Sequence, residues 1–402
     1  MFKPNNEKKE KGPESLYYSL EILNPNSQNN DIHSPATTST TPAEITANNN
    51  IPVLDNPNDY YMTVLTASIP LRNVPLFQIL IQTPIPTVND INTTIYSITL
   101  QYQNPSGAVI ATSAQTYLIY EPRNYYDVPN YSYPAPVQIY SPYYYCYQVQ
   151  QITDMMNVAF ASALTSLKAQ GGTGAIAAAV APFINYDAVT QLLTITSEEA
   201  FYDIESPFAY IAVYCNALAE PFFSGFPKIT NPISPSTPDG VDRQLIIKSY
   251  NGINVSGGII STIQNYTNYG YWSFVKRITV VTNMNINSEI FYLNQTNQQQ
   301  ENAITYGNKL IQNQQYVNVL FSFLPDLSQL EQELAAATKI QIYNAPTNLY
   351  NPITFNQCTP LYNFNIGIYV IDKFGNSFLL PISPNDSCHF KFQFIRKDLV
   401  KF

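Results

Sequence analysis

The sequence predicts a mainly β protein: a jelly-roll β-sandwich with a second or inserted β domain and one or two short helices. Apolar and polar residues alternate with period two in segments of both halves, as they do in half-buried strands. Tyrosine and phenylalanine, which favour pleated surfaces, number 32 and 21. Pro, Asn and Gly separate these segments at uneven intervals, which favours Greek-key connections over an up-and-down barrel.

The first half contains six expected strands. The alternation is clearest where Tyr96, Ile98, Leu100 and Tyr102 are interleaved with Ser97, Thr99, Gln101 and Gln103. The strands are expected at Tyr61–Ile69, Leu76–Gln82, Tyr96–Gln103, Ala108–Tyr120, Gln191–Ser197 and Tyr210–Cys215.

One helix, near residues 147–168, interrupts this series. Its apolar residues recur at helical spacing, and Gly171-Gly172 supplies a stop. The residues that define this apolar face are Val149, Ile152, Met156, Phe160, Ala163 and Leu167.

The second half repeats the β pattern. Strands are expected at Ile278–Ile286, Val317–Phe323, Phe364–Val370, Phe378–Ile382 and Phe390–Phe394. A loop containing Gly375 joins the third and fourth of these as a hairpin. Leu327, Leu330 and Leu334 suggest a short helix.

We expect three regions along the chain: a flexible N-terminal arm, 1–50; a first β region, 51–240; and a second β region, 241–402, which completes the jelly roll. The arm is rich in Thr, Pro and Asn and has too few apolar residues to offset its ordering entropy. We interpret the Pro-rich stretch Pro227–Pro238 as a linker or a long surface loop.

An apolar island inside the arm is the candidate assembly segment. It contains Leu16, Tyr17, Tyr18, Leu20, Ile22 and Leu23. An apolar island in a polar tail is typical of a docking segment, and the alternative is that it is the first strand of the sheet.

Charged residues make up only 12% of the chain, about half the usual share. Protein interfaces are depleted in Lys and Glu and enriched in aromatic residues, so a surface devoted to contacts would have this composition. Codon bias in an AT-rich genome is the alternative. The net charge of −9 argues against strong nucleic-acid binding, and the basic clusters at both ends read as solvated termini.

The sequence offers no convincing catalytic, cofactor or metal site. The only histidines are His33, in the arm, and His389, which alternates outward on a strand, and neither has an evident partner for acid–base work. The acidic group Glu198, Glu199, Asp203 and Glu205 lacks the spacing of a calcium loop and reads as a solvated turn. Cys146, Cys215, Cys358 and Cys388 lack C-x-x-C spacing and are expected as buried free thiols.

Neither a signal peptide nor a membrane span is expected. The first fifteen residues are polar and charged, and the apolar stretch from Ala175 to Ile184 is too short to cross a bilayer. These features favour intracellular synthesis. The most unusual local feature is a Tyr- and Pro-rich stretch between Tyr125 and Tyr145, which we interpret as an amphipathic contact surface.

The order of these features resembles the minor capsid, or penton, proteins of virophages and related Polinton-like DNA viruses. Tyr60–Leu65 with Ile69-Pro70 and Val74–Phe77 is similar to the opening strand and turn of that family. Thr94–Leu100 resembles its next strand, and Tyr143–Leu164 its aromatic approach to a helix. Ile371-Asp372 with Phe374–Asn376 resembles its last hairpin.

The resemblance implies a jelly-roll subunit of the virion, standing at the icosahedral five-fold vertex. It implies a homopentamer that contacts the surrounding major capsid protein of the same virus, with no cofactor and no enzymatic activity. The alternative is a β-rich viral surface fibre or receptor-binding module, for which the sequence shows no internal repeat.

Overall fold

The computed structural model describes residues 12–24, 41–71, 74–82, 92–121, 144–170, 174–231, 242–249, 255–268, 273–294, 314–325, 340–344, 352–373, 375, 377–382 and 386–400. The chain divides into two compact units. Unit 1 is Met1–Val74, Val275–Gln329 and Leu334–Phe402, and unit 2 is Pro75–Phe274 and Leu330–Glu333. In sequence, unit 2 is therefore largely an insertion into unit 1.

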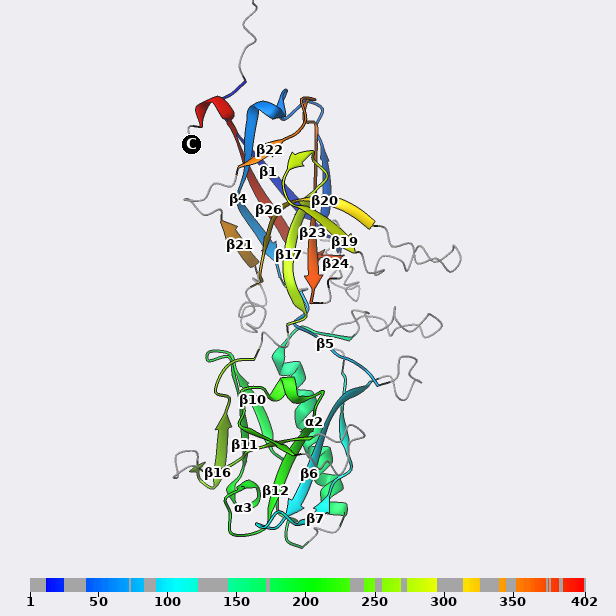
Figure 1. The fold of residues 1–402 in the computed structure, drawn as a ribbon, viewed down its shortest axis with the longest axis vertical. Coiled ribbons are helices and arrows are strands. Elements are labelled where there is room, and N and C mark those ends of the chain that lie inside the picture. Colours follow the sequence, from blue (N-terminus) through cyan, green and yellow to red (C-terminus); the bar gives the residue numbers. More distant parts are fainter. Residues whose placement is uncertain are drawn as a thin grey trace, which may run out of the picture. The chain divides into compact units, whose positions relative to one another are not determined.

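In the described residues, unit 1 contains antiparallel strands, which Figure 1 shows, and the short 3-10 helices η2 and η6. Its elements are β1 Ser15–Leu23, β2 Thr41–Pro42, β3 Glu44–Asn48, η2 Pro57–Asp59, β4 Tyr60–Pro70, β17 Val275–Thr282, β18 Ile286–Asn287, β19 Ile290–Asn294, β20 Gln314–Phe323, β21 Ile340–Asn344, β22 Ile353–Phe355, β23 Asn363–Asp372, β24 Ser377–Leu379, β25 Pro381–Ile382, β26 Ser387–Arg396 and η6 Lys397–Leu399. Two six-stranded sheets hold most of them: one runs β1-β26-β4-β22-β18 with β21 also on β4, and the other runs β19-β20-β17-β23-β24 with β3 also on β23.

Eight of these strands pair in a nested order. The first pairs with the last, β1 with β26, followed inward by β3 with β23, β4 with β21, and β17 with β20. Pairing of β26 with β4 and of β23 with β17 then joins these four ribbons into two sheets. A nested antiparallel ribbon that forms two sheets has the connections of a double Greek key. From these pairings we infer that unit 1 is a jelly roll.

Aromatic rings fill the space between the two sheets of unit 1. Phe364 of β23 stacks on Tyr18 of β1, with ring centroids 4.7 Å apart, and also contacts Phe392 and Phe394 of β26. In β23 the inward positions alternate from Phe364, so period-two patterning places one apolar set in this core. The core of unit 1 therefore contains residues separated by more than three hundred positions in the sequence.

Where the structure describes it, unit 2 has two larger sheets, a two-stranded sheet and one long helix. Its elements are β5 Phe77–Gln78, β6 Thr93–Gln103, β7 Val109–Thr112, β8 Thr116–Ile119, β9 Tyr145–Cys146, α2 Val149–Ala169, β10 Phe183–Asp187, β11 Leu192–Glu198, α3 Glu199–Tyr202, β12 Tyr210–Asn216, η4 Glu220–Phe223, β13 Lys228–Asn231, β14 Asp242–Leu245, β15 Val255–Ser256 and β16 Ile259–Ile263. The sheets run β10-β11-β16-β15, and β13-β14-β12-β6-β7 with β8 also on β6.

The predicted helix is confirmed as α2, which packs against β6, β8 and β10. All six residues of its predicted apolar face are buried. The side chain of Asn157 pairs with the backbone of Ile184 in β10: its Nδ2 donates to the carbonyl at 3.0 Å, and its Oδ1 accepts from the amide at 2.8 Å. The helix therefore supplies hydrogen-bond partners to the edge strand of the smaller sheet.

The structure confirms the mainly β fold, but it divides the chain differently from the expected regions 1–50, 51–240 and 241–402. The first of these is not a free arm, since Ser15–Leu23 and Glu44–Asn48 are strands of unit 1. The boundary at residue 240 lies inside unit 2, because the insertion returns to unit 1 only at Val275. Local sequence patterns do not reveal this arrangement, because the two parts of unit 1 lie on either side of the insertion and pair with each other only in the folded chain.

Most predicted strands are present, with changed lengths. Leu76–Gln82 contains only the two-residue β5, and Ala108–Tyr120 is divided into β7 and β8. Part of the predicted Pro-rich loop is strand β13. The hairpin is confirmed by the pairing of β23 with β24. The predicted short helix at Leu327–Leu334 and the stop at Gly171-Gly172 lie outside the described residues.

Candidate assembly surfaces

The candidate assembly segment is strand β1, and it pairs along its whole length with β26 of the same chain. Leu20 and Ile22 are buried in the core, and Leu16 and Tyr18 are half-buried. Tyr17 and Leu23 point the other way and remain 56% and 57% exposed. The alternative interpretation, a first strand of the sheet, therefore describes this segment, and only its outward side chains are available for contacts.

The outer face of this sheet is polar and aromatic. The hydroxyl of Tyr17 accepts a hydrogen bond from Gln393, and the ammonium group of Lys391 lies 5.5 Å from the centre of the Tyr17 ring. Glu21 lies opposite His389 across the β1–β26 pair, with 3.2 Å between Oε1 and Nε2. These side chains present a mixed surface on which Glu21 pairs with His389 and Lys391 lies over the Tyr17 ring.

His389 does not have the arrangement of a catalytic triad. Ser387 and Glu21 both contact the same ring nitrogen, Nε2, at 2.9 and 3.2 Å. A base that takes a proton from serine uses one ring nitrogen for the hydroxyl and the other for the carboxylate. The group is an exposed polar cluster on a sheet surface, and His33 lies outside the described residues.

The acidic group after β11 has structural partners. Glu198 accepts a hydrogen bond from the Val180 amide at 2.7 Å, and Glu205 pairs with Lys248 at 2.9 Å. Asp203 is buried and accepts hydrogen bonds from the Glu205 amide and the Ser249 hydroxyl. In place of the expected solvated turn, Glu198 and Asp203 flank the short helix α3, which begins at Glu199, and only Glu205 lies in the exposed turn beyond it. No cluster of potential metal ligands occurs among the residues that the structure describes.

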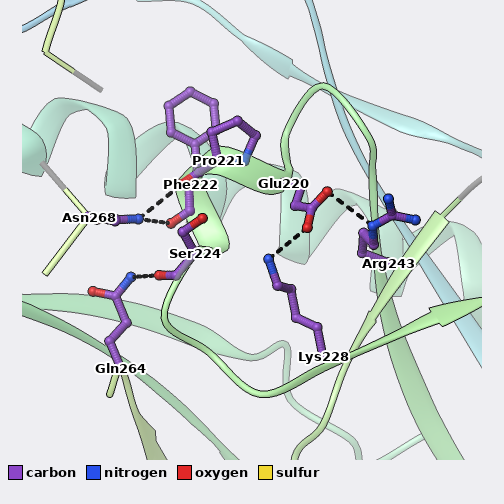
Figure 2. A network of polar contacts seen from close by, with 8 residues as sticks. All are labelled: Glu220, Pro221, Phe222, Ser224, Lys228, Arg243, Gln264 and Asn268. Carbon is purple, nitrogen blue, oxygen red and sulfur yellow. Dashed lines mark hydrogen bonds and ion pairs between the residues drawn. The ribbon is translucent and has the colours of Figure 1, made fainter. Parts of the chain in front are cut away.

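A polar network holds η4 in unit 2 (Figure 2). Glu220 accepts from Lys228 and from Arg243, each at 3.0 Å. Asn268 donates to the carbonyls of Pro221 and Phe222, and Gln264 donates to the carbonyl of Ser224. Together these contacts fix the backbone that places Phe222 and Phe223 in the core.

The charges in this network alter the acidity of Glu220. Burial raises the pKa of this carboxyl, but hydrogen bonds from Lys228 and Arg243 and the charges of both side chains outweigh burial and hold its pKa below the ordinary value. The carboxylate form is therefore the one that the fold favours.

The four cysteines are free thiols. Cys146, Cys215 and Cys388 are buried as expected, whereas Cys358 is exposed. Burial raises the pKa of Cys215 to about 12, since an apolar environment disfavours the thiolate. Three of the thiols are therefore packing residues, and Cys358 is the accessible one.

A hollow of about 160 Å³ lies on one face of the second sheet of unit 1. Its lining residues are Glu44, Val281, Asn283, Val317, Asn365, Gly367 and Tyr369. Pockets that bind cofactors or drug-sized molecules are typically about 300–1,000 Å³, so this hollow is too small for them. In the described part of the chain, no helix has the length and apolarity to cross a membrane.

The described end of the Tyr- and Pro-rich stretch is part of a core. Tyr144 and Tyr145 are buried in unit 2, where Tyr145 contacts Phe274 with ring centroids 5.2 Å apart. The earlier tyrosines of the stretch lie outside the described residues, so their predicted contact role stays a prediction.

Comparison with known proteins gives a curated relative and two solved structures. The uncharacterized protein V18 of Sputnik virophage is 31% identical to this chain over an alignment of 172 residues, which covers 40% of this chain and 90% of that protein. A chain in the cryo-EM structure of the Sputnik virophage matches with a TM-score of 0.71 and 25% identity, over 97% of this chain and 100% of that one. The mavirus penton protein matches with a TM-score of 0.55 and 12% identity, over 94% and 99% of the two chains.

The resemblance to virophage minor capsid proteins is thereby confirmed. The model of the family described as Sputnik minor capsid protein V18/19 matches residues 16–396, which include both units. The chain belongs to the Sputnik minor capsid protein V18/19 family and is a structural component of the virion capsid, not an enzyme.

Proposed function

We propose that this chain is the penton of its virus, a homopentamer at the icosahedral five-fold vertex that contacts the surrounding major capsid protein. The observation that carries the proposal is the extent of the likeness to the mavirus penton protein, which covers 94% of this chain and 99% of that one. The part of this chain that matches the mavirus penton protein includes the inserted unit 2 as well as the jelly roll of unit 1. The proposal therefore applies to both units.

The distribution of charge supports assembly through unit 1. Unit 1 contains 14 acidic and 14 basic residues, whereas unit 2 contains 14 acidic and 5 basic residues. The entire net charge of −9 therefore belongs to unit 2. Identical subunits packed around a ring bring like surfaces close together, and charge repulsion between them is smallest where the net charge is zero.

Native mass spectrometry of the full chain tests the pentamer. The expected species has a mass of about 226 kDa, five times the 45.2 kDa chain. A trimer would instead favour a surface fibre, and a monomer at high concentration would reject self-assembly. Mixing the purified ring with the major capsid protein tests the second contact, and co-sedimentation that depends on the ring is expected.

A further inference from the structure

In the described part of the chain, β1 lies at one edge of the first sheet of unit 1, and β21 lies at the opposite edge beside β22, which itself pairs with β18. Within the described residues, β1 pairs with β26 alone and β21 with β4 alone. The edge of β10 in unit 2 is different, because Asn157 supplies its hydrogen-bond partners. An edge strand exposes unpaired N–H and C=O groups that can accept a further strand.

Within the residues of β1 and β21 themselves, few features occur that usually prevent edge pairing. β1 has no Pro or Lys within its nine residues, and its one charge, Glu21, already faces His389. β21 has the sequence Ile-Gln-Ile-Tyr-Asn, without charge or proline. Charged side chains, proline and bulges are the features that natural sheets use to block such edges.

We propose that β1 of one copy of this chain pairs with β21 of the next copy, so that the sheet continues from subunit to subunit around the ring. The occupant of each free edge is thus a second copy of the chain. This inference rests on the proposed homopentamer and adds to it the identity of the strands that meet.

Strand direction favours this pair. Across the sheet, β1, β26, β4 and β21 alternate in direction, since each neighbouring pair is antiparallel. Rotation about an axis parallel to the strands preserves these directions, so β1 of the next copy would run antiparallel to β21. From edge to edge, the second sheet has five strands in the order β3-β23-β17-β20-β19. The same rotation would therefore place β3 of the next copy parallel to β19, and parallel pairing is less stable per residue.

Exposed apolar side chains lie on the same face at both edges. The registers align Glu21, His389, Ser68 and Ile342 in one row across the sheet. Ile342 is 63% exposed, and Tyr17 and Leu23 lie on the face of Glu21 by strand periodicity. A β1–β21 contact between copies would place Ile342 beside these side chains and cover part of each.

The pairing is also heterologous, meaning that each subunit uses two different edges. Heterologous contacts close into rings when the rotation permits, whereas β1 paired with β1 about a two-fold axis would stop at a dimer. The proposed contact is therefore of the kind that a pentamer requires.

Cysteine cross-linking tests the contact directly. In a Cys358→Ser background, Ile342→Cys is combined in turn with Tyr17→Cys, Ser19→Cys or Glu21→Cys, because the register between copies is not fixed in advance. Cross-strand neighbours lie about 4.5–5.5 Å apart at Cα, within disulfide range. After mild oxidation, we expect reducible ladders of up to five subunits on denaturing gels for at least one pair.

The controls separate this contact from the pentamer itself. Pentamers in native mass spectrometry without ladders in any double variant would overturn the edge pairing and leave the proposed function intact. Dimers from Ser19→Cys alone would overturn it in favour of a β1–β1 contact. Absence of pentamers for the unmodified chain would reject the proposed function and, with it, this inference.

A charge at the edge gives a second, independent readout. Ile342→Lys should raise the protein concentration below which rings dissociate by roughly five- to thirtyfold. In the free subunit part of the Ile342 side chain is exposed, and this factor corresponds to the loss of its burial in the contact. Ile51→Lys is the matched control, since Ile51 is 78% exposed in unit 1 and lies in neither strand. Equal effects of the two substitutions would overturn the proposal.

Discussion

Replacing Ile22 with alanine should destabilise unit 1 strongly, whereas the same change at its neighbour Leu23 should not. Ile22 is 3% exposed in the core, and Leu23 is 57% exposed on the opposite face of β1. Truncating a buried Ile to Ala costs about 2–5 kcal/mol. For Leu23, less than half of the side chain is buried, and full burial of leucine is worth about 1.5–3 kcal/mol, so the loss should be roughly 1 kcal/mol or less.

Urea denaturation followed by far-UV circular dichroism measures both losses. The concentration of subunits is kept low enough to avoid ring formation, so that the transition reports folding and not assembly. The slope of the transition should stay constant if only stability changes. Two small, equal losses would mean that the segment is a tail attached to a complete sandwich, and they would refute the placement of β1 in the sheet.

Other substitutions and conditions test unit 2 and the thiols. Phe160→Ala should cost about 3–5 kcal/mol, because this ring on the inner face of α2 is fully buried; a loss below about 1 kcal/mol would place it at the surface. At pH values above 4.5, the ordinary pKa of a glutamate carboxyl, the network around Glu220 should stabilise unit 2. This contribution should be lost as the pH falls through the lowered folded-state pKa of Glu220. Glu220→Gln should therefore flatten the acid dependence of stability in thermal melts. A thiol reagent should label one cysteine per native chain and four after unfolding, with the native signal abolished by Cys358→Ser; labelling of two or more native thiols would contradict the burial of the others.

Local patterns predicted the elements well and their partners poorly. Period-two alternation identified β6, β23 and β26, and helical spacing identified α2 with its buried face. The same alternation was present in β1, where Leu16, Tyr18, Leu20 and Ile22 point inward. The sequence alone favours a docking island there because polar, Pro-rich sequence follows it, and because its partner β26 begins more than three hundred residues later.

The polar contacts of unit 2 could not be predicted from the sequence. Glu220 pairs with Arg243 across 23 positions, and Gln264 accepts a hydrogen bond from the amide of Leu193 across 71. Such pairs depend on which loops the fold brings together, and a single Glu or Gln in a loop has no local signature. The insertion has no local signature for the same reason, since the pairing of β4 with β26 and β21 across it leaves no mark near residue 75.

A reconstruction of the virus particle tests the central claim most directly. The account predicts five copies of this chain around each five-fold axis, surrounded by the major capsid protein, with β1 of each copy beside β21 of the next. Density at the vertices that does not accommodate the nested β1–β26 sandwich, or density for this chain found only at other positions in the shell, would contradict it.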